Sequence, residues 1–287
     1  MYKRQVKISL LPGWTPECFA HDLALHRGYF PHDTLTESAV RRATAYYYAT
    51  IEHMDRHMGR LFDALKEMGL YDDAIIIITG DHGEEFMDHG GWWHGQTLYE
   101  EMIHVPYFIK LPGNRRGGEV NEDMARHVDI APTLLQFAGL PQPAAMLGQS
   151  LFDAAGNYTN AGILESFAHT DFESNRAVAV RTRDMKLIHM DEGPEYYRGM
   201  PPVELYGLEE NPLEAWPLNR AEDPAFAETR QRLEQRLEAH EQAVSGDAET
   251  ADGETPADAA QVVESAQEAP ALDPGVAAQL EALGYLN

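Results

Sequence analysis

Cysteine is almost absent from this chain of 287 residues, in which Cys18 is the only example. A single cysteine excludes an internal disulfide and a zinc site built from several thiolates. Long apolar runs are also absent, since no stretch approaches the ~20 residues that span a bilayer. The basic start has only Ile8 to Leu11 before Pro12, which is too short for the apolar core of a signal peptide. We therefore expect no membrane segment and no signal peptide, and the compartment stays unknown.

Positive charge is scarce. The chain has 22 Lys and Arg against 47 Asp and Glu, which gives a formal net charge of −25. Nucleic-acid binding needs a basic surface, so this composition excludes a nucleic-acid partner. No Lys or Arg follows Arg236, while acidic residues accumulate there. This pattern predicts an acidic linker over residues 244–274, followed by a docking segment over 275–287 in which Val276 to Tyr285 regain apolar helical spacing.

The first half of the chain alternates helical and strand patterns. Thr34 and Glu37 have the spacing of a capping box, and an apolar stripe rich in Tyr and Met then recurs at helical intervals until Gly69. We expect this stripe to pack in a core. Two apolar runs, 74–79 and 105–110, predict strands, and the first fits a central parallel strand that is buried on both faces. A further helix is predicted over 129–138, so residues 1–155 are expected to form an α/β core.

The second half has a different pattern, with short strands in place of long alternating elements. Strands are predicted over 162–165, 176–181, 185–189 and 203–208, and they suggest a smaller, partly antiparallel α+β unit over residues 156–243. A charged helix is predicted from Pro224 to Ala243.

A candidate metal site follows the first apolar strand, where Gly80 leads into Asp81, His82 and Gly83. Open α/β sheets place their ligands at the C-terminal ends of strands. A carboxylate beside an imidazole can bind a divalent cation, and such a mixed pair suits Ca²⁺ or Mg²⁺ less selectively than Mn²⁺ or Zn²⁺. His94 lies in a loop of glycines and tryptophans, which offers few structural reasons for an imidazole.

The other polar residues of this segment have a simpler interpretation. Glu84, Glu85, Asp88 and His89 are expected to form a solvated acidic turn, because charged side chains are rarely buried. Surface exposure is likewise expected for a group of basic residues that could attract an anion locally, namely Arg115, Arg116, Arg126 and His127.

Several ordered motifs resemble the sulfatase family of the alkaline phosphatase superfamily. They cover nearly the whole chain: Ile78 to Glu85, His94 to Glu101, Val105-Pro106, Pro112-Gly113, Gly117-Gly118, His127 to Leu135, Lys186 to Ile188, Glu204 to Tyr206 and Leu283 to Tyr285. The resemblance implies an alkaline-phosphatase-like core in which a mostly parallel sheet is flanked by helices.

The same resemblance implies roles for three residues. Asp81 and His82 would bind a divalent ion, with Ca²⁺ expected first and Mg²⁺, Mn²⁺ or Zn²⁺ as alternatives. His94 would hold a sulfate oxygen or assist the leaving group, at a position where many relatives have Lys. Asp129 is expected to cap a helix rather than to react. The implied substrate is a small-molecule or carbohydrate sulfate ester.

The sequence also departs from the family. Sulfatases make a formylglycine nucleophile from a Cys/Ser-x-Pro-x-Arg motif, and Cys18 is not in one. Only 33 residues precede Thr34, so the nucleophile and the N-terminal metal ligands are expected to belong to a missing N-terminal half. We expect the chain to be inactive alone. Asp-His at 81–82 also occurs in phosphonate monoester hydrolases and phosphoethanolamine transferases of the superfamily, so a phosphoryl or phosphonate ester hydrolase or transferase, and a catalytically dead accessory chain, remain alternatives.

Overall fold

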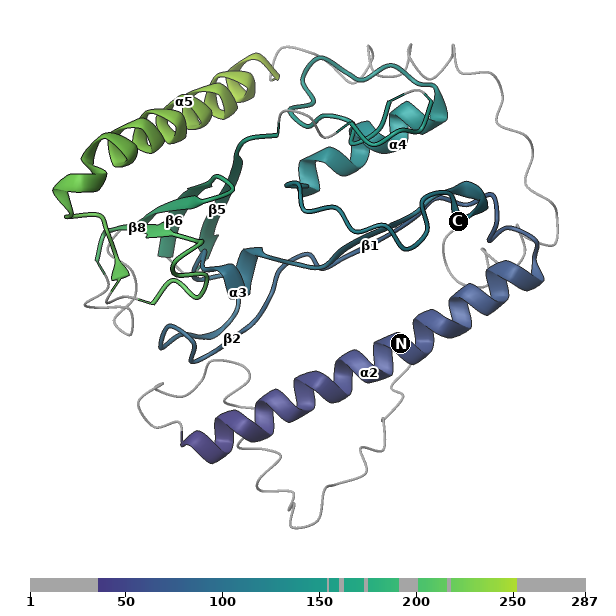
Figure 1. Cartoon of the computed structure of the whole chain (residues 1–287), viewed down its shortest axis with the longest axis horizontal. Coiled ribbons are helices and arrows are strands. Elements are labelled where there is room, and N and C mark those ends of the chain that lie inside the picture. Colours follow the sequence, from purple (N-terminus) through teal and green to yellow (C-terminus); the bar gives the residue numbers. More distant parts are fainter. Residues whose placement is uncertain are drawn as a thin grey trace. The chain divides into compact units, whose positions relative to one another are not determined.

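The structure is a computed structural model that describes residues 36–153, 155–159, 163–172, 175–190, 201–215 and 218–251. Helices and strands alternate through the first half, and a separate antiparallel sheet follows (Figure 1). The chain divides into two compact units, one ending at Glu238 and the other beginning at Ala239. Cys18 and the docking segment predicted over 275–287 lie outside the described residues.

The long helix is α2, Glu37–Glu67, as the apolar periodicity predicts. Its N-cap is Thr36, whose side chain accepts a hydrogen bond from the backbone N–H of Ala39, so the capping box predicted at Thr34 is wrong. The stripe expected in the core is largely exposed, with Ile51 48% and Met54 57% accessible. Helical spacing shows that one face of the helix is apolar, but it does not show which residues pack against that face.

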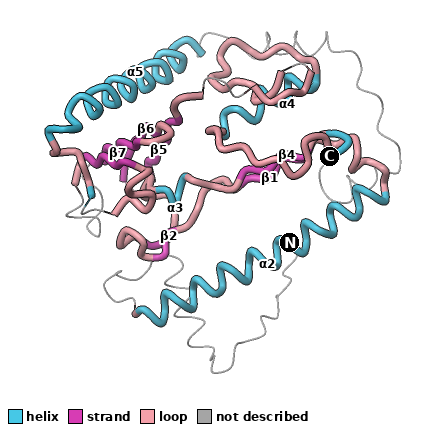
Figure 2. Tube along the Cα trace, viewed as in Figure 1, coloured by secondary structure: helices cyan, strands magenta, loops and turns pink. Residues whose placement is uncertain are grey.

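Two strands lead to and from the candidate site. β1, Ile76–Thr79, pairs with β4, Tyr107–Lys110, and the two lie side by side (Figure 2). They are antiparallel, with Ile76 opposite Lys110 and Thr79 opposite Tyr107, so the mostly parallel sheet is not confirmed among the described strands. Both strands are only half-buried or exposed, in contrast to the burial on both faces that we expected for 74–79.

The helix predicted over 129–138 is present as α4, Ile130–Ala138, preceded by the 3₁₀ turn His127–Asp129. It ends at Gly139, whose φ of 67° is the left-handed conformation that favours glycine. Asp129 stands at the N-terminus, but its side chain does not cap α4. The fully buried carboxylate instead accepts hydrogen bonds from the Arg126 side chain, from the backbone N–H of Gln149 and from the backbone N–H of Arg126, so it caps the 3₁₀ turn that precedes α4.

The second half contains a four-stranded sheet in the order β5-β6-β7-β8, and every neighbouring pair is antiparallel. The strands are β5 Ser166–Phe172, β6 Asn175–Arg181, β7 Met185–Met190 and β8 Val203–Gly207. The strand predicted over 162–165 is therefore wrong, since residues 163–165 are outside any strand and β5 begins at Ser166.

Alternate residues of β6 point to opposite faces of this sheet. Ala177 and Ala179 pack with Leu98 and Tyr99, which follow the candidate site in the chain. On the other face, apolar strand residues pack against the helix α5, Ala227–Ala251, through Leu233 and Leu237. The sheet thus supports the site from one side.

A 3₁₀ turn, Pro224–Phe226, and α5 together confirm the predicted charged helix. α5 continues to Ala251, so the first eight residues of the predicted linker, 244–251, are helical. Among the described helices, none is long and apolar enough to cross a membrane. The domain boundaries predicted at 155, 243 and 274 stay predictions.

Candidate metal and substrate site

The loop after β1 carries Asp81 and His82 and is held close to a short helix, α3, Glu100–Ile103. The backbone N–H of Gly83 donates to the carbonyl of Met102 at 2.8 Å, and the N–H of Glu84 donates to the carbonyl of Glu101 at 3.2 Å. A Cβ atom on Gly83 would lie 1.7 Å from the Glu101 carbonyl oxygen. Glycine is therefore required at this position because the two backbones approach so closely.

The two candidate ligands present their donor atoms side by side. Asp81 Oδ2 lies 3.9 Å from His82 Nε2, a separation that one cation with bonds of about 2.1 to 2.4 Å to each atom can bridge. His82 Nδ1 lies 2.8 Å from the Gly83 carbonyl oxygen, a contact that places the proton on Nδ1 and leaves the Nε2 lone pair for a metal. A hydrogen bond from the His82 backbone N–H, helped by the nearby imidazole, lowers the pKa of the Asp81 carboxyl. This pair fits a divalent cation.

His94 joins the same group. Its ring stacks on that of His82 with centroids 4.5 Å apart. Its Nδ1 lies 3.2 Å from both carboxylate oxygens of Glu84, whose side chain is only 12% exposed. Glu84 therefore orients the imidazole and leaves Nε2 as the ring nitrogen that can face a substrate.

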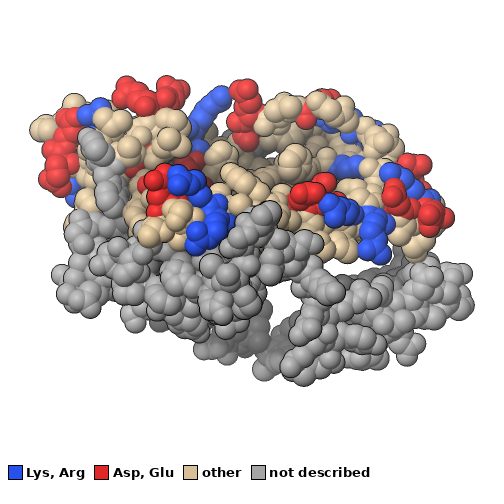
Figure 3. Space-filling model, turned by 90° about the horizontal axis from the view of Figure 1, so that it is seen from below, with Lys and Arg blue, Asp and Glu red and all other residues tan. Residues whose placement is uncertain are grey.

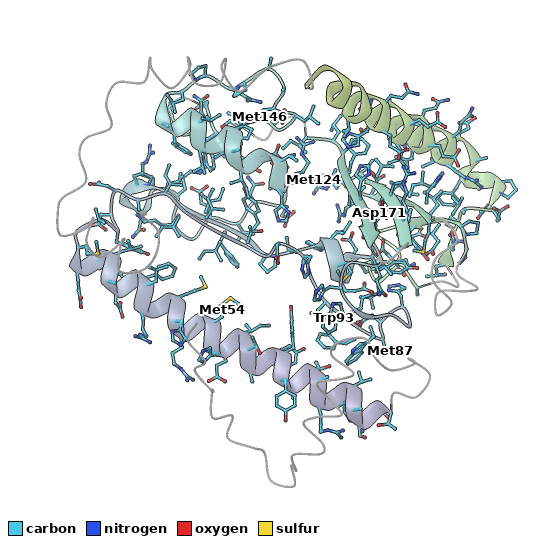
Figure 4. All side chains as sticks on the ribbon, turned by 180° about the vertical axis from the view of Figure 1, so that it is seen from behind. Met54, Met87, Trp93, Met124, Met146 and Asp171 are labelled. Carbon is cyan, nitrogen blue, oxygen red and sulfur yellow. The ribbon has the colours of Figure 1, made fainter. Side chains whose placement is uncertain are left out.

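His94 follows a small hairpin made by β2, Glu85–Phe86, and β3, Trp92–Trp93. Trp93 has a φ of 86° and Met87 a φ of 72°, a backbone region that side-chain-bearing residues rarely adopt. Trp92 is 3% exposed, while Trp93 is half-buried and stacks on His94 with centroids 4.9 Å apart. Figure 4 labels Trp93 and Met87 near each other at this hairpin.

The expected solvated acidic turn is correct only for Asp88, which is exposed. Glu85 is fully buried and His89 is 6% exposed. His89 Nδ1 lies 2.6 Å from Glu101 Oε1, its Nε2 lies 3.0 Å from the Glu214 carbonyl, and its ring stacks on Tyr99. For His89 the prediction failed because its hydrogen-bond partners lie 12 and 125 positions away in the sequence.

A buried ionic network ties α3 to the four-stranded sheet. Lys186 of β7 is fully buried, with Nζ 2.9 Å from Glu214 Oε1 and 3.2 Å from Glu100 Oε1. Arg181 donates to both oxygens of Glu100 at 3.0 and 3.1 Å. Burial would raise the pKa of Glu100, but the hydrogen bond from His104 and the charges of Lys186 and Arg181 hold it well below its usual range. The network fixes α3, and α3 in turn holds the loop of Asp81 and His82.

Comparisons with known proteins identify the family. The sulfatase model matches residues 18–140, and the model of the N-sulphoglucosamine sulphohydrolase C-terminal region matches residues 88–243, which is over half of the chain. The chain belongs to the sulfatase family. It has the alkaline-phosphatase-like α/β fold of that family.

Relatives of this sulfatase chain include arylsulfatase K of Bos taurus, 33% identical over 147 residues, covering 50% of this chain and 27% of the relative. The multifunctional alkaline phosphatase superfamily protein PehA of Trinickia caryophylli is 31% identical over 258 residues, covering 79% and 48%. The solved structure of BT4656 in complex with its substrate D-glucosamine-2-N,6-O-disulfate has a TM-score of 0.58 and 25% identity, covering 79% and 46%. The chain thus spans about half, or less, of the length of these relatives.

The basic residues that were expected to attract an anion differ from one another in their environment. Arg126 is not a plain surface residue, because it forms an ion pair with the buried Asp129 at 2.8 Å and donates to the Glu165 carbonyl. Arg116 pairs with Glu119 at 2.7 Å. His127 is exposed, and its Nε2 lies 3.3 Å from Thr79 Oγ1 at the end of β1. On the face in Figure 3, the described basic side chains lie beside acidic ones and form no continuous basic patch.

Two contributors to the site were missed by reasoning from the sequence. Glu84 was assigned to solvent, yet it orients His94 across ten positions of the chain. Lys186 was noted as part of a motif, but its buried contacts with α3 were not expected. The position of Glu84 directly after Asp81-His82-Gly83 could have indicated a role at the site. No local sequence pattern indicates a buried ion pair between residues as distant as Lys186 and Glu100.

The buried imidazole of His89 provides a pH prediction. Burial lowers its pKa, but the hydrogen bond and charge of Glu101, together with Glu214, outweigh burial and raise the pKa above about 6.5. A raised folded-state pKa means that this stabilisation is complete below about pH 6.5 and is lost as pH rises through the folded value. We expect the NMR titration of His89 to have a midpoint above that of the unfolded chain, and Glu101→Gln to lower it. A wild-type midpoint below the unfolded value would contradict the assignment.

Proposed function

We propose that the chain forms part of a sulfuric ester hydrolase and contributes Asp81 and His82 to its divalent-metal site. The observation that carries this proposal is the facing pair of donors, Asp81 Oδ2 and His82 Nε2, at the end of β1 with His94 stacked beside them. Ca²⁺ is the first expectation, and Mg²⁺, Mn²⁺ and Zn²⁺ are alternatives. The substrate class we propose is a small-molecule or carbohydrate sulfate ester, in line with the glucosamine disulfate named in the BT4656 complex.

The chemistry of these residues is consistent with that role. A bound cation would polarise the ester and offset the negative charge that builds on its oxygens. His94, oriented by Glu84 through Nδ1, would as a cationic imidazole donate from Nε2 to a sulfate oxygen or to the departing oxygen. Glu84 would thus act on the reaction through His94.

Two ligands are too few for a hard divalent cation, which prefers ~6. Within the described ranges, no group of three or more His, Cys, Asp or Glu could hold a metal. We propose that a missing N-terminal half provides the nucleophile and the remaining ligands. The exposed apolar stripe of α2 supports this proposal, since such a surface requires a partner.

The purified chain is therefore expected to bind Ca²⁺ weakly and to give no turnover of an aryl sulfate in excess Ca²⁺. Calorimetric titration of Ca²⁺ into the wild-type chain and into Asp81→Asn measures the first expectation, and the variant should bind still more weakly because it loses an anionic ligand. Turnover well above the buffer rate would overturn the proposal that the nucleophile is missing. Equal Ca²⁺ binding by Asp81→Asn would overturn the metal site itself.

A phosphoryl or phosphonate ester hydrolase or transferase is a second candidate. The Asp-His pair at 81–82 favours it, and so does the likeness to PehA, which is named as a multifunctional member of the superfamily. Phosphoryl transfer needs the same in-line geometry and charge clamp as sulfuryl transfer. Rates on matched sulfate and phosphate esters, measured on a complete protein that contains this chain, would decide between the two.

A catalytically dead accessory chain is the third candidate, favoured by the absence of a Cys/Ser-x-Pro-x-Arg motif from the sequence. Sequencing the DNA upstream of Met1 separates it from an enzyme. An in-frame Cys-x-Pro-x-Arg would support the hydrolase, whereas a promoter and a translation start at Met1 would support the accessory chain.

A further inference from the structure

Three rings stack in a row at the candidate site. The His82 and His94 centroids are 4.5 Å apart with planes inclined by 29°, and the His94 and Trp93 centroids are 4.9 Å apart with planes inclined by 28°. The row runs from a proposed metal ligand, through the proposed substrate-facing histidine, to an indole. Trp93 is half-buried, so part of its ring surface reaches solvent.

Trp93 has an energetically unfavourable backbone conformation. Its φ of 86° lies in the region that favours glycine, and a bulky side chain there is strained. The hairpin nevertheless holds this conformation, through pairing of Trp93 with Glu85 and a hydrogen bond from the Met87 N–H to the Gly91 carbonyl at 2.9 Å. Strain that the surrounding structure maintains next to a site is an indication of a functional side chain.

The two neighbouring tryptophans differ in what they contact. Trp92 is 3% exposed and packs edge-to-face on Phe86 with centroids 5.7 Å apart, so core packing accounts for it. Trp93 is half-buried and its ring stacks on that of His94. The contact with His94 places the indole of Trp93 beside the candidate site.

We propose that Trp93 is a specificity-determining residue, whose indole is a stacking platform for a ring in the alcohol part of the ester. This inference rests on the proposed function, in which His94 faces the sulfate or the departing oxygen. A ring attached to an oxygen at His94 reaches Trp93, because the two side chains are in contact. Ring faces, whether of an aryl group or of the C–H face of a sugar, stack on indole without needing charge. Ring-bearing esters are thereby favoured over short alkyl esters.

Saturation-transfer NMR on the chain in Ca²⁺ buffer tests this proposal, because the method detects weak binding. The probes are phenyl sulfate, methyl glucoside 6-sulfate and methyl sulfate. The variant is Trp93→Gly, which removes the indole and relieves the positive φ, so folding is retained. The matched control is Met87→Gly, which relieves a positive φ in the same hairpin and leaves the indole in place. Far-UV circular dichroism verifies that both variants are folded.

We expect Trp93→Gly to weaken binding of the ring-bearing esters by about threefold to tenfold, the range of one aromatic stacking contact, with methyl sulfate unchanged. Met87→Gly should leave all three affinities unchanged. Loss with phenyl sulfate alone would identify an aryl platform, and loss with the glucoside alone a sugar platform.

Equal weakening of all three probes, or of none, would overturn the role of Trp93 while leaving the proposed function intact. Absence of binding of every sulfate ester to the wild-type chain would overturn the proposed half-site, and the role of Trp93 with it.

Discussion

Lys186→Met is expected to lower the free energy of unfolding by about 3–5 kcal/mol, the cost of leaving a buried charge without its partner. Lys186 and Glu214 are both fully buried and lie 2.9 Å apart. Methionine is close to lysine in length but has no charge. The variant therefore keeps the packing volume and isolates the electrostatic loss, which urea unfolding at pH 8 would measure.

The pH dependence provides a second readout for this variant. Burial already raises the pKa of Glu214, against the opposing charge of Lys186, and removal of Lys186 would raise the pKa further. A carboxyl with a raised folded-state pKa is favoured in its protonated form, so the variant should lose less stability at low pH and more as pH rises.

The matched control for Lys186→Met is Lys66→Met, because the Lys66 side chain is 55% exposed and pairs with Asp63 only at 3.6 Å. The control should change stability by at most about 0.5 kcal/mol. A similar small loss in Lys186→Met would mean that the network does not support α3.

Gly83→Ala is expected to cost about 3 kcal/mol of stability, because its new Cβ would fall 1.7 Å from the Glu101 carbonyl oxygen and 2.8 Å from the carbonyl carbon. Both atoms belong to backbone, so no side-chain rotation can relieve the clash. The loop of Asp81 and His82 would have to separate from α3 and lose the hydrogen bond from Gly83 to Met102. Thermal unfolding measures the stability, and the shift of the His82 ring resonances reports the movement of the loop.

Gly59→Ala is the control for this substitution. Gly59 lies within α2, and an added Cβ would meet nothing within 4 Å. Alanine in a helix is more stable than glycine by about 0.5–1 kcal/mol, so this variant should gain stability. If Gly83→Ala behaved like Gly59→Ala, the close contact between the metal loop and α3 would not exist.

Local sequence patterns predicted the helices and strands that are determined by residues close together in the sequence. The periodicity of α2, the glycine that ends α4 and the apolar strand before Asp81 each depend on residues a few positions apart. The same kind of pattern misplaced the cap of α2 by two residues and missed the start of β5 at Ser166. Element ends depend on individual hydrogen bonds, which residue type predicts less well than the existence of a helix or strand.

Burial of polar groups could not be predicted in this way. Glu85 and His89 look like members of a solvated turn because their neighbours in the sequence are acidic or small. In the fold, His89 is enclosed by Glu101, Tyr99 and the Glu214 carbonyl. His89 can be buried because distant segments supply its partners, and the identity of those segments is a property of the tertiary structure.

The sequence by itself determined the family and the residues proposed for the chemistry, because Asp81, His82 and His94 stand in ordered motifs at short spacing. Only the tertiary structure decided how these residues are oriented. The Gly83 carbonyl sets the ring of His82, Glu84 sets the ring of His94, and α3 supports the loop through the ionic network around Lys186. The reason is physical: residue type specifies which donor atoms are available, whereas the direction of the His94 ring and the support of the loop depend on contacts between residues that are ten and 86 positions apart.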